Sequence, residues 1–176
     1  MKKKIYAICI AGVFIIAAVA AFIFYDKAPA RDSVPTLDSI STTEASNLIQ
    51  KEFADTLGYT EDANPLTKLI YEYFSITVTS VTGTEDDGEV HCSVSNCNVS
   101  EILTSIFSLS EAYTVETYTT ALSTAFSNSP AYSKDLRVSI RKENGSFIVE
   151  LTDAQFDACS GGLLTYYETL TQKGGK

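Results

Sequence analysis

The chain contains one histidine, His91, and imidazole is the side chain best suited to proton transfer near neutral pH. His91 lies in a segment where apolar and polar residues alternate, and it shares its parity with Glu89 and Ser93. An imidazole beside a carboxylate and a hydroxyl has the residue types of an acid–base site. The same alternation puts Val90 and Cys92 on the core face and His91 on the other face. We therefore interpret His91 as an exposed strand residue and predict no catalytic residue.

Thiols are the other reactive groups of the chain beyond its N-terminal segment, at Cys92, Cys97 and Cys159. Alternation places Cys92 in the core, where cysteine behaves as a small hydrophobic residue. Cys97 precedes an expected helix start, where backbone N–H groups lower a thiol pKa, so it is a candidate reactive thiol. A Cys97–Cys159 or Cys92–Cys159 disulfide would join the last helix to the sheet, and three free thiols are the alternative. The close pair spacing of a zinc site is missing.

Two further patterns have residue types found in ion-binding or phosphate-binding sites. Residues 85–89 (EDDGE) are strongly acidic, but they lack the alternating ligand spacing of a calcium loop, and like charges at a hairpin tip are normally solvated. Gly161-Gly162 follows an expected helix, whereas a phosphate-binding loop precedes one. We therefore predict neither a metal ion nor a cofactor.

Apolar residues recur at helical spacing in segments 41–58, 65–74, 98–129 and 152–161. Each segment has at its start a side chain that can accept a hydrogen bond from a free backbone N–H group: Ser41, Asn64, Asn98 and Thr152. The remainder, Leu163 to Lys176, has apolar content but no firm period, so we expect at most one or two helical turns there.

Two hairpins complete the domain. Residues 75–79 and 90–95 alternate in polarity around the polar loop 83–89, and alternation returns at Leu136, Val138 and Ile140. Asn144-Gly145 predicts a type I′ turn, because both residues tolerate positive φ. Four strands from two hairpins, with helices on one face, predict an α+β domain with an antiparallel, curved sheet.

The N-terminal segment predicts a membrane anchor. Lys2, Lys3 and Lys4 precede an uncharged apolar run, Ile5 to Tyr25, whose length as a helix is about 31 Å. This run exceeds the 7–15 residue core of a signal peptide, which favours an uncleaved anchor. The lysines place the N-terminus in the cytoplasm and the C-terminal domain outside the membrane. Residues 1–25 are thus the cytoplasmic tip and anchor, 26–40 an extended, proline-bearing stalk, and 41–176 the extracytoplasmic domain.

The chain is acidic, with 13 basic and 22 acidic residues and a formal net charge of −9. Without Lys2, Lys3 and Lys4 the charge is −12. Such a surface repels phosphate backbones and anionic headgroups, so we predict no nucleic-acid partner.

Three stretches resemble a known superfamily: GEVHCSVSNCNVSEIL (88–103), LRVSIRKENGSFIVEL (136–151) and DAQFDACSGGL (153–163). Similar runs occur in bacterial extracytoplasmic proteins of the nuclear-transport-factor-two-like or cystatin-like superfamily. The resemblance implies a cone-shaped domain whose open end binds a small apolar molecule, or a sheet face used for dimerisation. Members often carry Trp where this chain has Phe147, and they usually lack the cysteines. No set of catalytic residues carries over.

These features predict a membrane-anchored extracytoplasmic domain that binds a small apolar ligand or an envelope protein without catalysis. The alternative is an enzyme that uses the cone interior, with Tyr73, Tyr113 or Tyr118 as proton donors. A structural subunit of an envelope complex is a third hypothesis, because small residues permit close packing of the anchor helix, namely Ala17, Ala18, Ala20 and Ala21.

Overall fold

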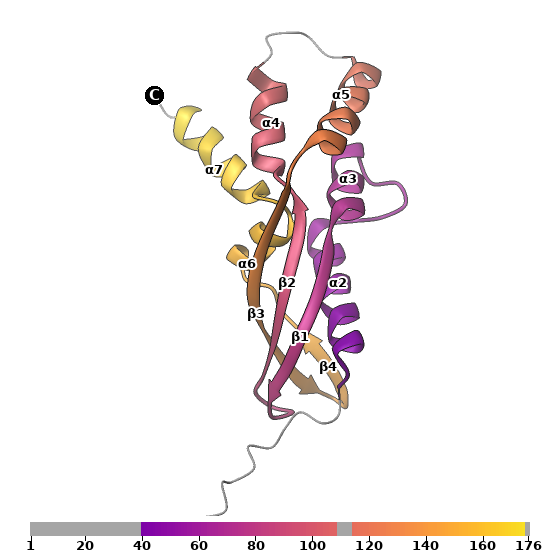
Figure 1. The fold of residues 1–176 in the computed structure, drawn as a ribbon, viewed down its shortest axis with the longest axis vertical. Coiled ribbons are helices and arrows are strands. Elements are labelled where there is room, and N and C mark those ends of the chain that lie inside the picture. Colours follow the sequence, from indigo (N-terminus) through magenta and orange to yellow (C-terminus); the bar gives the residue numbers. More distant parts are fainter. Residues whose placement is uncertain (1–39, 109–113, 175–176) are drawn as a thin grey trace, which may run out of the picture. The chain divides into compact units, whose positions relative to one another are not determined.

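An antiparallel sheet and six helices form the part of the chain that the computed structural model describes, residues 40–108 and 114–174 (Figure 1). The elements follow in the order α2 (Thr42–Leu57), α3 (Pro65–Tyr73), β1 (Ser75–Gly83), β2 (Gly88–Cys97), α4 (Val99–Ser108), α5 (Val115–Asn128), β3 (Ala131–Glu143), β4 (Ser146–Val149), α6 (Asp153–Cys159) and α7 (Leu163–Gly174). The prediction of an α+β domain with four strands from two hairpins is confirmed. No helix among these residues is long and apolar enough to cross a membrane. The predicted anchor and nearly all of the stalk lie outside the described residues.

The sheet has the strand order β1-β2-β3-β4, with every neighbouring pair antiparallel. The predicted turn is present, with positive φ at Asn144 (51°) and Gly145 (83°). On the central strand β2, alternate residues point into the core, so Val90, Cys92 and Val94 are buried as predicted. Strand β3 begins at Ala131, five residues before the first alternating position, Leu136.

The helix starts confirm the predicted capping residues. The Ser41 hydroxyl accepts a hydrogen bond from the Glu44 N–H (3.1 Å), and the Asn64 and Asn98 side chains accept from N–H groups three residues on. Thr152 and Gln155 form a reciprocal capping box. The segment predicted as one long helical connection contains two helices, α4 and α5, and residues 109–113 between them are outside the described part.

The core lies between the sheet and α2, which contributes Ala45, Ile49 and Phe53. The Phe53 ring centroid is 4.4 Å from that of Phe74 and 5.8 Å from that of Phe156, so α2, the end of α3 and α6 share one aromatic cluster. All buried apolar residues of this core lie between residues 40 and 166. Residues Thr36–Lys176 form a compact unit with its own core, and we expect them to fold without the preceding segment.

A buried polar junction holds several helices at the end of β2. Asn96, which is 2% exposed, donates through Nδ2 to the backbone oxygens of Ile70 (2.9 Å) and Cys159 (2.8 Å). Its Oδ1 accepts from the Cys97 N–H at 2.7 Å. The Ser100 N–H donates to the Gly161 oxygen at 3.2 Å. Backbone from α3, α4 and the α6–α7 connection is thereby fixed around the last residues of β2.

Candidate functional site

An apolar pocket of about 340 Å³ lies among four helices. These helices, α3, α4, α5 and α7, lie at the end of the sheet where β2 ends and β3 begins (Figure 1). The described residues that line the pocket are seven leucine, phenylalanine and tyrosine side chains, none of them charged: Leu66, Leu103, Phe107, Tyr118, Tyr166, Tyr167 and Leu170. Its volume and apolar lining are typical of small-molecule sites.

The pocket has a buried interior and an exposed rim. Leu103 is 1% exposed and Tyr166 is 5% exposed, whereas Phe107 and Tyr167 are 59% and 50% exposed. The Phe107 ring lies 6.1 Å from the Tyr118 ring and 6.3 Å from the Tyr166 ring. Exposure of large apolar side chains to water is unfavourable. An exposed apolar rim of this kind is typical of a surface that binds a partner or ligand.

Helix α7 supplies three of the seven lining residues, and sequence reasoning missed most of it. The segment was expected to hold one or two helical turns, but α7 is a helix of 12 residues. A stripe of Leu163, Tyr166 and Leu170 at i, i+3 and i+7 is present in the sequence and would have indicated it. The threonines between these positions weaken the pattern, because Thr has low helix propensity.

None of the described lining side chains is charged, and the pKa values of two of the phenols are raised. Burial raises the pKa of Tyr118, and the neighbouring phenols of Tyr167 and Tyr166 raise it further. Burial also raises the pKa of Tyr166, with a smaller contribution from Tyr167. The phenols of Tyr118 and Tyr166 therefore keep their protons at neutral pH and can donate hydrogen bonds. Among the described residues, the lining offers no carboxylate or imidazole to serve as a base.

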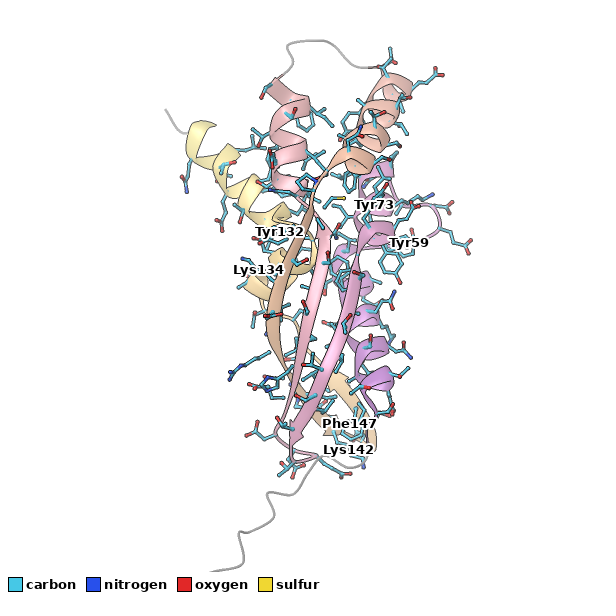
Figure 2. The ribbon with its side chains drawn as sticks, in the orientation of Figure 1. Tyr59, Tyr73, Tyr132, Lys134, Lys142 and Phe147 are labelled. Atoms are coloured by element: carbon cyan, nitrogen blue, oxygen red, sulfur yellow. The ribbon has the colours of Figure 1, made fainter. Side chains whose placement is uncertain are left out.

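The three tyrosines considered as proton donors separate in the structure. Tyr118 lines the pocket, whereas Tyr113 lies outside the described residues. Tyr73 lies between α3 and α5, with its hydroxyl 3.2 Å from the Ser127 hydroxyl and its ring 5.5 Å from the Phe126 ring (Figure 2). Tyr73 thus packs between α3 and α5 and contributes to the contact between these two helices.

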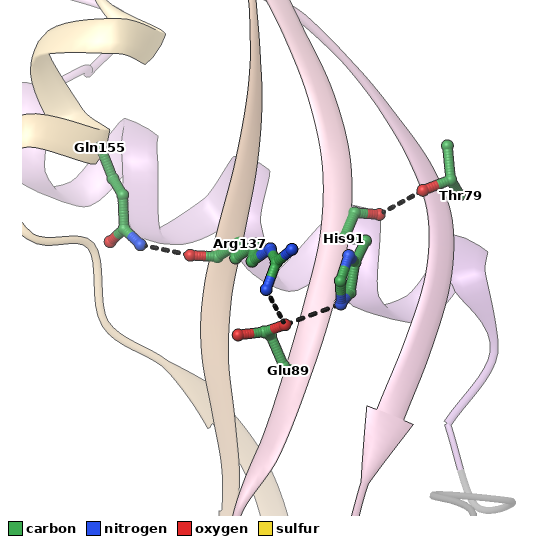
Figure 3. Close-up of polar contacts among 5 residues, drawn as sticks. All are labelled: Thr79, Glu89, His91, Arg137 and Gln155. Atoms are coloured by element: carbon green, nitrogen blue, oxygen red, sulfur yellow. Dashed lines mark hydrogen bonds and ion pairs between the residues drawn. The ribbon is translucent and has the colours of Figure 1, made fainter.

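The polar face of the sheet has a second depression, of about 350 Å³, next to His91. The imidazole Nε2 lies 2.7 Å from Glu89 Oε1, and Arg137 Nη1 lies 3.7 Å from the same oxygen (Figure 3). His91 is on the outer face, as the alternation predicted. The side chains of His91, Glu89 and Arg137 are 34%, 43% and 72% exposed, so water weakens these pairs and each contributes little to stability.

The acidic loop between β1 and β2 is held by an ion pair. Glu85 Oε1 accepts from Lys142 Nζ at 2.9 Å, and its backbone oxygen accepts from the Lys142 N–H at 2.7 Å. At that end of the sheet the Lys142 ammonium also lies over the Phe147 ring (Figure 2). Within the described ranges no three His, Cys, Asp or Glu side chains gather as metal ligands would.

Cys92, Cys97 and Cys159 are free and buried. At Cys97, the candidate reactive thiol, burial raises the pKa, and a hydrogen bond with Ser129 opposes this only in part. Burial, with a smaller contribution from the Cys92 thiol, raises the pKa of Cys159 to about 12. Burial also raises the pKa of Cys92, so Cys92 and Cys159 are both in the protonated, less reactive form at neutral pH.

We expect the folded domain to react with Ellman's reagent at pH 8 at least tenfold more slowly than the urea-unfolded chain, because the thiols are inaccessible and protonated. A thiol with a raised folded pKa stabilises the fold fully below its unfolded pKa, near 9, and this contribution is lost as the pH rises toward 12. Urea unfolding from pH 8 to 11 should show this decline, and Cys159→Ala should make it shallower. A thiol of the native protein that reacts within seconds would contradict this expectation.

No family model, curated protein or solved structure matches this chain.

Proposed function

We propose that this domain binds small apolar molecules in the helical pocket, without catalysing a reaction there. The observation that carries the proposal is a hollow of about 340 Å³ whose lining consists of leucine, phenylalanine and tyrosine side chains. A ligand that fills it removes apolar surface from water, at about 25 cal/mol per Å². Binding is therefore favourable for a molecule of suitable shape.

Two features favour ligand binding over catalysis and over a flat protein interface. The described lining residues lack a base, and raised pKa values keep Tyr118 and Tyr166 as hydrogen-bond donors, so these residues supply no acid–base pair. The site is also hollowed, with Leu103 and Tyr166 buried inside the rim. A protein interface of ordinary size needs about 800 Å² on each partner, whereas a small molecule needs only the hollow.

The N-terminal sequence favours a location outside the membrane for this binding activity. The lysines and the apolar run of residues 5–25 favour a single-span anchor, with the domain outside the membrane. The resemblance to the cone superfamily also favours an apolar ligand. It implies a pocket inside a curved sheet, however, whereas all seven lining residues here come from helices.

We expect the fragment of residues 36–176 to bind the neutral dye Nile red, and Phe107→Asp to weaken binding at least tenfold. The substitution removes one aromatic wall, worth about 1.5–3 kcal/mol when buried, and places a charge at the rim. Because Phe107 is 59% exposed, the fold should tolerate it. Fluorescence titration at constant protein concentration measures the dissociation constants.

Val115→Asp is the matched control, because Val115 is 83% exposed, lies outside the pocket lining and receives the same charge. It should leave dye binding within twofold of wild type. Equal binding by the Phe107→Asp variant would show that the dye binds elsewhere. Light scattering on the same samples tests the competing protein-interface role, since a dimer that dissociates in Phe107→Asp would replace the ligand proposal.

A further inference from the structure

We propose that the pocket selects uncharged apolar molecules that carry a hydrogen-bond acceptor, such as a ketone, ester or amide oxygen, and that the Tyr166 hydroxyl donates to it. This inference rests on the proposed function and specifies the chemistry of the ligand.

The Tyr166 phenol lies in an aromatic cluster at the pocket. Its ring lies between those of Phe107 (6.3 Å) and Tyr167 (5.9 Å). The backbone of Tyr166 is satisfied, because its N–H donates to the Gly162 oxygen at 3.0 Å and its carbonyl accepts from the Thr169 hydroxyl at 2.7 Å. Among the described residues, by contrast, no group hydrogen-bonds to the Tyr166 hydroxyl.

A tyrosine that is 5% exposed normally has a partner for its hydroxyl. In the described part of the chain, no fully buried side-chain nitrogen or oxygen lacks a hydrogen bond, so the Tyr166 oxygen still reaches open space. Tyr166 lines the pocket, and we infer that its hydroxyl opens into that hollow. A ligand that excludes water from the hollow must replace the lost hydrogen bond, or the phenol is left unpaired at a cost.

The charge of the pocket and of the chain also favours an uncharged ligand. None of the seven lining side chains is cationic, and the chain as a whole carries a formal charge of −9. A carboxylate or phosphate moved into this hollow would lose its hydration without gaining a counter-charge, which is strongly unfavourable. An uncharged acceptor avoids the cost of dehydrating a charge and still accepts a hydrogen bond from the Tyr166 hydroxyl. The raised pKa values of Tyr118 and Tyr166 agree with this, because these phenols keep the proton that they donate.

Three naphthalenes of nearly the same shape test the inference by displacing Nile red from the fragment of residues 36–176. They are 2-acetylnaphthalene, with a neutral acceptor, 2-isopropylnaphthalene, with no acceptor, and 2-naphthoate, with a charged one. We expect the ketone to bind about three- to tenfold more tightly than the hydrocarbon, the range of one uncharged hydrogen bond. The carboxylate should bind at least tenfold more weakly than the ketone.

Tyr166→Phe removes only the hydroxyl and should abolish the advantage of the ketone while leaving hydrocarbon binding within twofold. Tyr59→Phe is the control, because Tyr59 stacks on Tyr71 with ring centroids 4.0 Å apart and lies outside the lining (Figure 2). Equal affinity of ketone and hydrocarbon in the wild type, or tightest binding by the carboxylate, would overturn this inference and leave apolar binding intact. Failure of all three compounds and of the dye to bind would overturn the proposed function itself.

Discussion

Replacing Gly161 with alanine is expected to destabilise the domain by about 3 kcal/mol or more, a large share of the 5–15 kcal/mol of an ordinary domain. Gly161 has φ of +69°, a conformation that costs an L-residue about 1–2 kcal/mol. A Cβ there would also lie 2.0 Å from the Cys97 backbone oxygen, so backbone must move. Urea unfolding followed by circular dichroism measures the loss.

Gly58 provides a matched control with the same φ of +69° and no atom within 4 Å of a Cβ. Gly58→Ala should cost only about 1–2 kcal/mol, the conformational part of the effect. The difference between the two variants then isolates the contact between Gly161 and the end of β2. Equal destabilisation would show that this close approach has no energetic role.

Asn96→Asp is expected to destabilise the domain by about 3–5 kcal/mol at pH 7, since breaking a buried polar network leaves groups unsatisfied. The change keeps the side-chain shape but removes the Nδ2 donor to the oxygens of Ile70 and Cys159. An ionised carboxylate would instead face these two carbonyl oxygens. The introduced carboxyl is buried, so its folded pKa should be raised and its penalty should grow as the pH increases.

The test is urea unfolding between pH 4 and pH 8, where the deficit of Asn96→Asp relative to wild type should widen with increasing pH. Asn64→Asp is the control, because Asn64 is an N-cap whose Oδ1 accepts from the Thr67 N–H, and Asp performs that role equally well. That variant should stay within about 0.5 kcal/mol of wild type. A deficit of Asn96→Asp that is independent of pH would argue against the buried carboxyl.

Both residues matter for the pocket as well as for stability. Gly161 lies between α6 and α7, and Asn96 fixes the ends of α3 and α6, so together they position the helices that carry Leu66, Tyr166 and Leu170. Milder substitutions at the junction should therefore weaken Nile red binding before they unfold the domain.

The local elements of this fold can be read from the sequence, because their signals and their partners lie within a few residues. Ser41, Asn64 and Asn98 each accept from an N–H group three residues away, and Asn144-Gly145 forms its turn from its own backbone preferences. Alternation likewise placed Cys92 in the core and His91 outside it. The α+β class follows from these local patterns.

The start of β3 shows where local signals end. Residues 131–135 (AYSKD) have no apolar alternation, yet they extend the strand, because the backbone N–H and C=O groups of β2 up to Cys97 require hydrogen-bonding partners. Long-range pairing thus overrides a segment with weak strand preference.

The pocket and the polar junction depend on residues that are distant in the chain. The two backbone oxygens that accept from Asn96 lie 26 and 63 residues away, and the pocket lining extends from Leu66 to Leu170. In the sequence, each lining residue is only one member of an apolar stripe at helical spacing. Such a stripe is equally consistent with a filled core. Whether four such stripes meet with a hollow between them depends on how the helices pack around the end of β2. For that reason the candidate site could be identified only from the folded domain.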